Sequence, residues 1–452
     1  MIANLQTARG VPAAIGVLGL LLAATPAAGG GSGPDAGAVP LTLAEAVARA
    51  RTASATLREL DARLAAAEAD RRLAAAGRAP EITARAGYAR LSDVPELTLF
   101  EPGVGARTLF PNIPDNYRAA IDLTAPLYTG GRIAARIDSA ERKTDAARHD
   151  LAAGGADLIL EVTAAYWELT VAREREAVLA RAIASFDAHL ADARNLLRFG
   201  MAARNDVLAV EVERHRAELE SLSAAAGARI AAANLSRLLD LPPGSRVELA
   251  DPLASSTAEA GSPNDLVAEA LAARPERRGL AALADAAAAR VRLERGDRRP
   301  RLAATAGYLY ARPNRNVLPF EDRFDATWEV ALNLSFKLFD GGRRQAAEAR
   351  AEAGEEALRH RLEDLERRIR LEVTSRRVEL DTALAAVEVA EGGVEAAREN
   401  LRVASDRFRE GLVPSSERLD AETALLGAEL DRTSALAAAR LARARLERSL
   451  GR

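Results

Sequence analysis

The chain consists of two related halves, and this internal repeat limits its possible folds more than any other feature of the sequence. Pro80 and Gly87 recur 220 residues later, as Pro300 and Gly307. Other landmarks of the first half recur at a spacing of 211 residues, namely Gly130-Gly131-Arg132, Gly200, Leu208 and Ala217-Glu218-Leu219. A repeat of this kind predicts two copies of one structural unit.

The two spacings differ by nine residues, and the difference falls between the Gly-Tyr and the Gly-Gly-Arg landmarks. There the first half carries a Pro/Gly-rich stretch over 94–114, and the second half carries a shorter one over 313–325. Insertions collect in surface loops, so we expect a surface loop in both places. Beyond these loops the two halves keep equal lengths, as paired helices require. We therefore predict one repeat over 41–260 and a second over 261–452.

Each half contains two stretches in which apolar and polar residues alternate, which is typical of β-strands. We predict strands at about 81–92, 117–128, 301–311 and 328–338. In the last of these, one face carries only large apolar side chains, those of Trp328, Val330, Leu332, Leu334 and Phe336. On the opposite faces we expect lumen-facing polar residues, among them Arg118, Asp122, Glu329, Asn333 and Lys337.

These strands have the length and the two-faced pattern of transmembrane barrel strands. About 11 residues suffice for a tilted strand to cross a bilayer, with one face toward lipid and the other toward water. For one such hairpin alone, a half-buried hairpin of a soluble domain is the favoured alternative. Two related hairpins, on a chain whose N-terminal residues 1–28 predict a signal peptide for export, favour the membrane barrel instead.

The remaining parts of each half show helical periodicity. An apolar stripe predicts a helix over 41–79 that ends at Pro80. Beyond the Gly-Gly pair, a helix from Gly131 to about Phe199 would be roughly 100 Å long at 1.5 Å per residue. Apolar residues recur there every seven positions, in the second half as Val373, Leu380, Val387, Val394, Leu401 and Phe408. Such a repeat predicts left-handed supercoiling, although a soluble coiled coil would share it.

Both long helices stop at a glycine, which predicts helix hairpins. Arg198-Phe199-Gly200 and the segment from Arg407 to Gly411 break the pattern before new helices over 206–239 and 416–450. Glycine commonly ends a helix because it adopts the left-handed conformation without strain.

The N-terminus has the features of an export signal. Arg9 precedes an apolar run over 11–24, and small residues follow it. The run is shorter than the roughly 20 residues of a membrane-spanning helix, so we predict a signal peptide over 1–28, with an uncleaved anchor as the alternative. A flexible Gly/Ser/Pro-rich linker is predicted over 29–40.

No residue pattern predicts catalysis, a cofactor or a metal site. Cysteine is absent, and a net charge of −3 argues against a nucleic-acid partner. The chain has four histidines, and we expect each to be a solvated helix residue: His149, His189, His215 and His360. The acidic pairs lie among arginines, where surface ion pairs explain them. We therefore predict that the protein is not an enzyme.

The order of these motifs resembles that of the TolC-type outer-membrane efflux proteins. The resemblance covers nearly all of 41–450 and rests on the duplicated order of helix, Pro, Gly-Tyr strand, Pro126-Leu127-Tyr128-Thr129-Gly130-Gly131-Arg132, long helix and Arg198-Phe199-Gly200. The family pattern at the start of a repeat is present as Ala270-Leu271-Ala272-Ala273-Arg274-Pro275-Glu276. The first half departs from it, with Ser54-Ala55 where Asn-Pro is usual, which leaves only that helix cap in doubt.

The resemblance implies a mainly α-helical homotrimer with a 12-stranded β-barrel in the outer membrane of a Gram-negative bacterium, above a long periplasmic α-helical coiled-coil barrel. It also implies a periplasmic adaptor protein and an inner-membrane pump of RND or ABC type as partners. The adaptor would dock at the periplasmic tip, where the family motif falls on Arg198, Gly200, Arg407 and Gly411. Nearby charges could form a gate, namely Asp406, Arg409 and Glu410.

Two functions remain open from the sequence. The first is a passive exit duct of a tripartite efflux or type I secretion system, which carries small molecules or proteins to the exterior. The second is an exported structural coiled-coil protein without a pore. The two-faced strands favour the duct, because a structural coiled coil does not need them.

Overall fold

The structure is a computed structural model that describes residues 40–103, 105–242, 244–254 and 261–452. The predicted signal peptide and all but the last residue of the predicted linker lie outside these residues. The first half contains β1 (Pro40–Leu41), α1 (Leu43–Ala53), α2 (Ala55–Ala76), β2 (Glu81–Arg90), β3 (Leu97–Glu101), β4 (Gly105–Phe110), β5 (Asp115–Tyr128), α3 (Arg132–Arg198) and α4 (Arg204–Leu238). β6 (Glu248–Leu249) follows α4 near the end of the first half. The second half contains α5 (Pro263–Ala273), α6 (Pro275–Gly296), β7 (Arg301–Arg312), β8 (Asp325–Ser335), α7 (Arg343–Arg409) and α8 (Ser415–Leu450).

The first helical stretch is divided, unlike the single helix expected over 41–79. The break falls at Ser54, whose hydroxyl accepts a hydrogen bond from the Leu57 amide at 3.2 Å and caps α2. Arg274 occupies the corresponding junction between α5 and α6. Ser is a strong N-cap residue because its oxygen satisfies an amide that the helix leaves unpaired. The atypical Ser54 therefore still starts a new helix.

The four long strands form one antiparallel sheet in the order β2-β5-β7-β8. Glu81 pairs with Thr124 in the first hairpin, and Arg301 pairs with Ser335 in the second. Glu81 and Arg301 are 220 residues apart, and Thr124 and Ser335 are 211 residues apart, which are the spacings of the repeat. Both hairpins therefore have the same register. Strands β2 and β8 form the two edges of the sheet, and each edge is unpaired within the described residues.

The Pro/Gly-rich stretch over 94–114, expected to be a loop, contains an additional short β-hairpin that is separate from the four-stranded sheet. Strands β3 and β4 pair antiparallel, with Phe100 opposite Ala106, and the hydroxyls of Thr98 and Thr108 lie 3.2 Å apart. Alternating apolar residues on both sides of a Pro-Gly turn account for this hairpin. The β3–β4 hairpin occupies most of the stretch over 94–114, which is the part of the first half that is longer than its counterpart in the second half.

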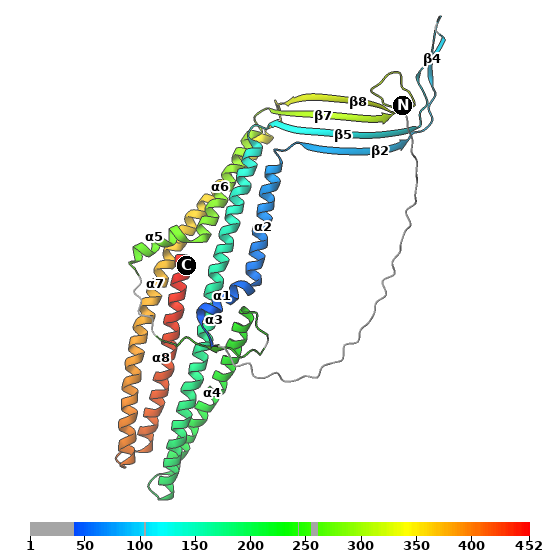
Figure 1. The fold of residues 1–452 in the computed structure, drawn as a ribbon. Helices are drawn as coiled ribbons and strands as arrows, with labels where there is room; N and C mark the ends of the chain where they lie inside the picture. Colours follow the sequence, from blue (N-terminus) through cyan, green and yellow to red (C-terminus); the bar gives the residue numbers. More distant parts are fainter. Residues whose placement is uncertain (1–39, 104, 243, 255–260) are drawn as a thin grey trace, which may run out of the picture. The chain divides into compact units, whose positions relative to one another are not determined.

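Helices α3 and α7 are each continuous over 67 residues, as the sequence predicts. Figure 1 shows the four-stranded sheet at one end of these helices and the α3–α4 and α7–α8 turns at the other end. The predicted seven-residue stripe of α7 is buried at Val373, Leu380, Val387, Val394 and Phe408. α3 packs against both α4 and α8, so the two helix hairpins share the α3–α8 junction.

A short parallel pairing connects the start of the first repeat to a segment near the end of that repeat. β1 pairs with β6, and Tyr166 of α3 lies beneath them. The Tyr166 hydroxyl lies 2.9 Å from both the Leu41 carbonyl and Asp251 Oδ2, and it accepts a bond from the Asp251 amide at 3.1 Å. Burial raises the pKa of the Tyr166 phenol to about 12.

In the part of the chain that the structure describes, none of the helices combines the length and the apolar character needed to span a membrane. The described residues also contain no cluster of three or more potential metal ligands.

Candidate functional site

The four-stranded sheet has one face lined by apolar side chains that the chain itself does not cover. On β8, Leu332 is 68% exposed, and Trp328, Val330 and Leu334 are exposed to a similar degree. The register places apolar residues of the other strands on the same face, including Ile82, Ala84, Ile121, Leu123, Leu302, Ala304 and Tyr308. An exposed apolar surface of this extent marks a face that contacts lipid or another protein.

The opposite face of the sheet is polar. Asp122 and Glu329 lie on either side of Gly307 in one row across the strands. A Cβ atom at Gly307 would lie 3.4 Å from Glu329 Cγ and 3.6 Å from Asp122 Oδ1, so glycine leaves the two acidic side chains room. Arg85 forms an ion pair with Asp122 across β2 and β5.

The other residues expected to face the lumen lie as follows. Arg118 shares the polar face with Asp122, four residues before it on β5. Asn333 donates from Nδ2 to the Thr305 hydroxyl at 3.0 Å. Lys337 lies two residues beyond the end of β8, so the structure does not place it in a strand.

Both helix-hairpin turns have the same backbone geometry. Gly200 and Gly411 have φ angles of +71° and +73°. The amide of Gly200 donates to the Leu197 carbonyl at 3.0 Å, and the next amide, that of Met201, donates to Leu196 at 2.9 Å. The amides of Gly411 and Leu412 repeat this pattern. These are Schellman caps, which require a residue in the left-handed conformation at the glycine position.

The charged residues around the turns are solvent-exposed or partly exposed. Arg198 is exposed, and it makes no ion pair or side-chain hydrogen bond with any described residue. Arg407 lies 3.4 Å from Glu417. Among the predicted gate residues, Asp406 pairs with Arg409 at 3.0 Å, three residues along the same helix, whereas Glu410 is exposed.

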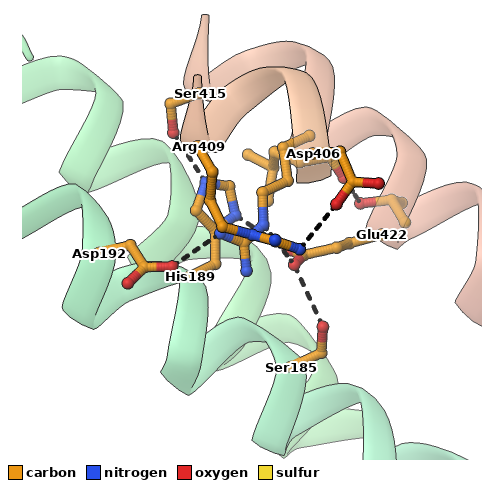
Figure 2. Close-up of polar contacts among 10 residues, drawn as sticks. Ser185, His189, Asp192, Asp406, Arg409, Ser415 and Glu422 are labelled. Atoms are coloured by element: carbon orange, nitrogen blue, oxygen red, sulfur yellow. Dashed lines mark hydrogen bonds and ion pairs between the residues drawn. The ribbon is translucent and has the colours of Figure 1, made fainter. Parts of the chain in front are cut away.

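His189 is fully buried, so the expectation that every histidine is solvated is wrong at this position. It lies on α3, 11 residues before Gly200, with an exposed fraction of 0%. Its Nδ1 lies 2.9 Å from Glu422 Oε2, and its Nε2 lies 2.9 Å from the Ser415 hydroxyl. Both partners belong to α8, and Figure 2 shows them facing the histidine from the other helix hairpin. Because a carboxylate only accepts hydrogen bonds, Nδ1 donates to Glu422.

Further polar contacts complete this buried cluster. Glu422 Oε1 accepts from the Ser185 hydroxyl at 3.1 Å and from Arg418 Nε at 3.2 Å. Arg418 also donates to Asp192 at 2.9 Å, and the ring of Phe408 lies 5.4 Å from the His189 ring. We call this set the tip network. It consists of Ser185, His189 and Asp192 of α3, Phe408 of α7, and Ser415, Arg418 and Glu422 of α8.

The sequence pattern contains only a weak signal for the tip network. Ser185, His189 and Asp192 each precede a buried seam residue of α3, namely Phe186, Leu190 and Ala193. They therefore lie on the edge of the apolar stripe. Side chains at such positions can contact either solvent or a neighbouring helix. The partner residues on α8 lie more than 220 positions away in the sequence, and the repeat does not predict this contact.

A family model and a curated relative match the sequence of this chain. The family model described as "Outer membrane efflux protein" matches residues 46–240 and 266–452. Protein CyaE of Bordetella pertussis is 29% identical over 308 residues, which are 68% of this chain. The aligned part spans 62% of that relative's own length.

Solved structures of outer-membrane channels have the same fold. The outer-membrane channel OprN superposes with a TM-score of 0.76 at 24% identity, and the alignment covers 90% of this chain and 89% of OprN. The outer membrane protein VceC of Vibrio cholerae superposes with a TM-score of 0.75 at 18% identity, over 90% of this chain and 96% of VceC.

Proposed function

Because the chain belongs to the outer membrane efflux protein family, we propose that it is the outer-membrane exit duct of a tripartite efflux or type I secretion system. It would act as a passive conduit from the periplasm to the exterior, and it would not be an enzyme. The observation that carries this proposal is the four-stranded sheet, which has one apolar face, one polar face and two unpaired edges.

The unpaired edges support assembly with further copies of the chain. In lipid, every backbone amide and carbonyl needs a partner, so an open sheet cannot span a membrane. Four strands are too few to close a barrel, whereas three copies would supply twelve. In such a barrel β8 of one chain would pair with β2 of the next chain. We therefore propose a homotrimer in which the apolar face contacts lipid and the polar face lines the lumen.

The internal repeat supports a specific register for this pairing between chains. β5 pairs with β7 inside the chain, and β8 and β2 are the strands that correspond to them in the repeat. The pair Leu123–Ala306 of β5 and β7 then corresponds to Leu334 paired with Ala86 of the next chain. Because both hairpins already share one register, the same correspondence is expected to hold at the edge.

The different lengths of β5 and β8 support the same conclusion. β5 continues to Tyr128, and its last residues pair only with β7. The corresponding residues of β8, over 336–339, lie beyond its end at Ser335. They have no neighbouring strand within the described chain. We propose that β2 of the next chain extends β8 over these residues, including Lys337.

The helix-hairpin turns are the proposed contact site for a periplasmic adaptor protein, which joins the duct to an inner-membrane pump. Arg198 is exposed without a partner among the described residues, so its guanidinium is available to a carboxylate of another protein. Gly200 and Gly411 fix the shape of the turns through their positive φ angles. The proposed gate residues are Asp406 and Arg409, in the last turn of α7, and Glu410, directly after the helix.

Planar bilayer recordings would test the exit-duct proposal. We would add the purified full-length protein to a lipid bilayer in potassium chloride and measure the current. A duct gives discrete current steps, and the protein sediments as a trimer in detergent. A coiled-coil protein without a pore gives no current at any protein concentration, and this result would refute the proposal.

A further inference from the structure

A groove of about 870 Å³ lies along the middle of α3, between α4 and α8. We call it the α3–α4–α8 groove, because all three helices line it. Large apolar side chains form part of its wall, among them Trp167 and Leu179 of α3 and Leu430 and Leu441 of α8. Pockets that hold small organic molecules have volumes of roughly 300–1,000 Å³ and mainly apolar walls. The groove is therefore large enough for a ligand with several rings.

The groove opens on the side of α3 and α8 that faces away from β1 and β6. On α8, Thr433 lines a separate cavity next to β6, whereas Asp431 and Ser434 line the groove. On α3, Tyr166 bonds to the backbone of β1, whereas Val171 lines the groove. In a tube that conducts cargo, β1, β6 and the packed helix α1 have room only on the outside. The groove then faces the lumen of the proposed duct.

Three carboxylates line the groove without a positive partner. Glu168, Glu220 and Asp431 are exposed, and none of them forms an ion pair or a side-chain hydrogen bond with another described residue. Among the described residues, the basic side chain that lines the groove is Arg175, which donates to the Ser434 hydroxyl at 2.9 Å. Three acidic side chains against one basic side chain leave an excess of two negative charges.

Acidic residues on other faces of the same helices do have partners. Glu174 of α3 lies 3.6 Å from Arg181, and Glu429 of α8 lies 2.8 Å from Arg398. These pairs neutralise their carboxylates locally, which the carboxylates of the groove lack. Acidic side chains along an apolar cleft concentrate cations there, because the low-dielectric walls focus the field.

The internal repeat explains how two of the carboxylates come to flank the groove. Glu220 of α4 and Asp431 of α8 are 211 residues apart and occupy corresponding positions of the two halves. α4 and α8 both pack on α3, so each helix brings one carboxylate to its own side of the groove. Trp167 has no such counterpart, since Val378 stands at the corresponding position of α7. The aromatic wall is therefore specific to this groove.

We propose that the α3–α4–α8 groove is a reversible binding site for cationic amphiphiles, which combine an apolar ring system with a positive charge. The rings pack against the apolar wall with Trp167, and the charge lies near Glu168, Glu220 and Asp431. This inference rests on the proposed function as an exit duct and names a class of cargo for it. Weak binding is compatible with conduction, because a transported species must be able both to enter a site and to leave it.

Two ions of nearly the same shape and opposite charge test this preference, namely tetraphenylphosphonium and tetraphenylborate. The chain has two tryptophans, so Trp328→Phe leaves Trp167 as the fluorescent reporter in the groove wall. We expect tetraphenylphosphonium to change the Trp167 emission of the purified trimer in a saturable way, with weaker binding at high potassium chloride because salt screens the carboxylates. We expect no saturable change with tetraphenylborate. An equal response to both ions, or none to tetraphenylphosphonium, would overturn the proposal.

Charge-neutralising variants in the same background identify the residues that attract the cation. Glu220→Gln combined with Asp431→Asn removes two charges at nearly constant volume, and the Kd for tetraphenylphosphonium should rise severalfold. Glu174→Gln is the matched control, because Glu174 lies on the side of α3 that faces β6, and its Kd should stay at the parent value. If the double variant forms no trimer in size-exclusion chromatography, Glu168→Gln replaces it, with a smaller rise expected. An unchanged Kd in the folded variant would count against the site.

Bilayer recordings test whether the occupied groove faces the lumen. Tetraphenylphosphonium at its binding concentration should lower the potassium chloride current of the wild-type trimer, and the double variant should need more of the ion for the same effect. An unchanged current despite measured binding would refute the luminal position. A protein that carries no current even without the ion would instead refute the exit duct, so the two proposals fail in different ways.

Discussion

The substitution Leu332→Arg tests which face of the sheet contacts lipid. Leu332 lies on the apolar face of β8, opposite Ala304 of β7, and it is 68% exposed in the single chain. In the repeat it corresponds to Ile121, which lies at the middle of the 14-residue strand β5. It should therefore lie near the bilayer midplane in the assembled barrel. Asn333 is the matched control, since it is the next residue and lies on the polar face.

The expected cost follows from the depth of the position and the number of copies. An arginine on the lipid face of a barrel costs about 2–4 kcal/mol at the midplane. A trimer carries the substitution three times, so the total is roughly 6–12 kcal/mol per barrel. This is comparable to the whole folding free energy of a typical domain, about 5–15 kcal/mol. At Asn333 the added arginine would extend into water beside Thr305, and little cost is expected.

The amount of trimer in the outer membrane measures this difference. Both variants would be expressed at matched levels, and folded trimer would be quantified in membrane extracts by size and by resistance to detergent. We expect Leu332→Arg to lose most of the trimer and Asn333→Arg to keep it. If both variants assembled equally well, or if Asn333→Arg were the more damaging one, the assignment of the faces would be wrong.

Three further predictions concern the helical part. Gly154→Ala places a Cβ atom 2.3 Å from Leu60 Cδ1 and should destabilise each chain by about 1–3 kcal/mol. The neighbouring Gly155→Ala has open space around it and should be neutral or stabilise the chain by up to about 1 kcal/mol. Equal shifts of the melting temperature for the two variants would contradict the close packing of Gly154 against Leu60. Arg198→Glu should reduce chemical cross-linking to the adaptor while trimer levels stay normal, and unchanged cross-linking would argue against docking at this turn. Burial raises the pKa of Tyr166 to about 12, so its contribution to stability should be complete below pH 10 and lost as the pH rises toward 12. The phenolate absorbance of Tyr166 is the difference between the pH titrations of the wild type and of Tyr166→Phe. A phenolate of Tyr166 that forms near pH 10 would refute this prediction.

The parts of the fold that depend on local patterns could be predicted from the sequence. The long helices follow from a seven-residue apolar repeat, which is interrupted in α3 at Glu176. The ends of α3 and α7 follow from Gly200 and Gly411, whose positive φ angles other residues adopt at a cost. The two-residue alternation indicated the four long strands. The break at Ser54 was less evident, because a serine cap without the usual proline is a weak signal within a helical stretch.

The parts that depend on contacts between distant segments could not be predicted in this way. His189 has the same helical setting in the sequence as the solvated His215, and only the approach of α8 distinguishes them. The β3–β4 hairpin was hidden because proline and glycine at its turn resemble a loop. Only for His189 is the deciding partner a distant segment that no local periodicity identifies; the β3–β4 hairpin pairs neighbouring segments on either side of its turn.

Disulfide trapping between chains tests the central claim, that this chain supplies one third of a closed barrel. The natural chain has no cysteine, so Leu334→Cys and Ala86→Cys can be combined in one chain, with Leu334→Cys and Tyr88→Cys as a control shifted by two residues. Oxidation in intact outer membranes should convert the first variant into covalent trimers on a denaturing gel and leave the control mostly monomeric. Monomers from the first variant, or equal trapping in both, would contradict a barrel closed by β8 and β2 of neighbouring chains.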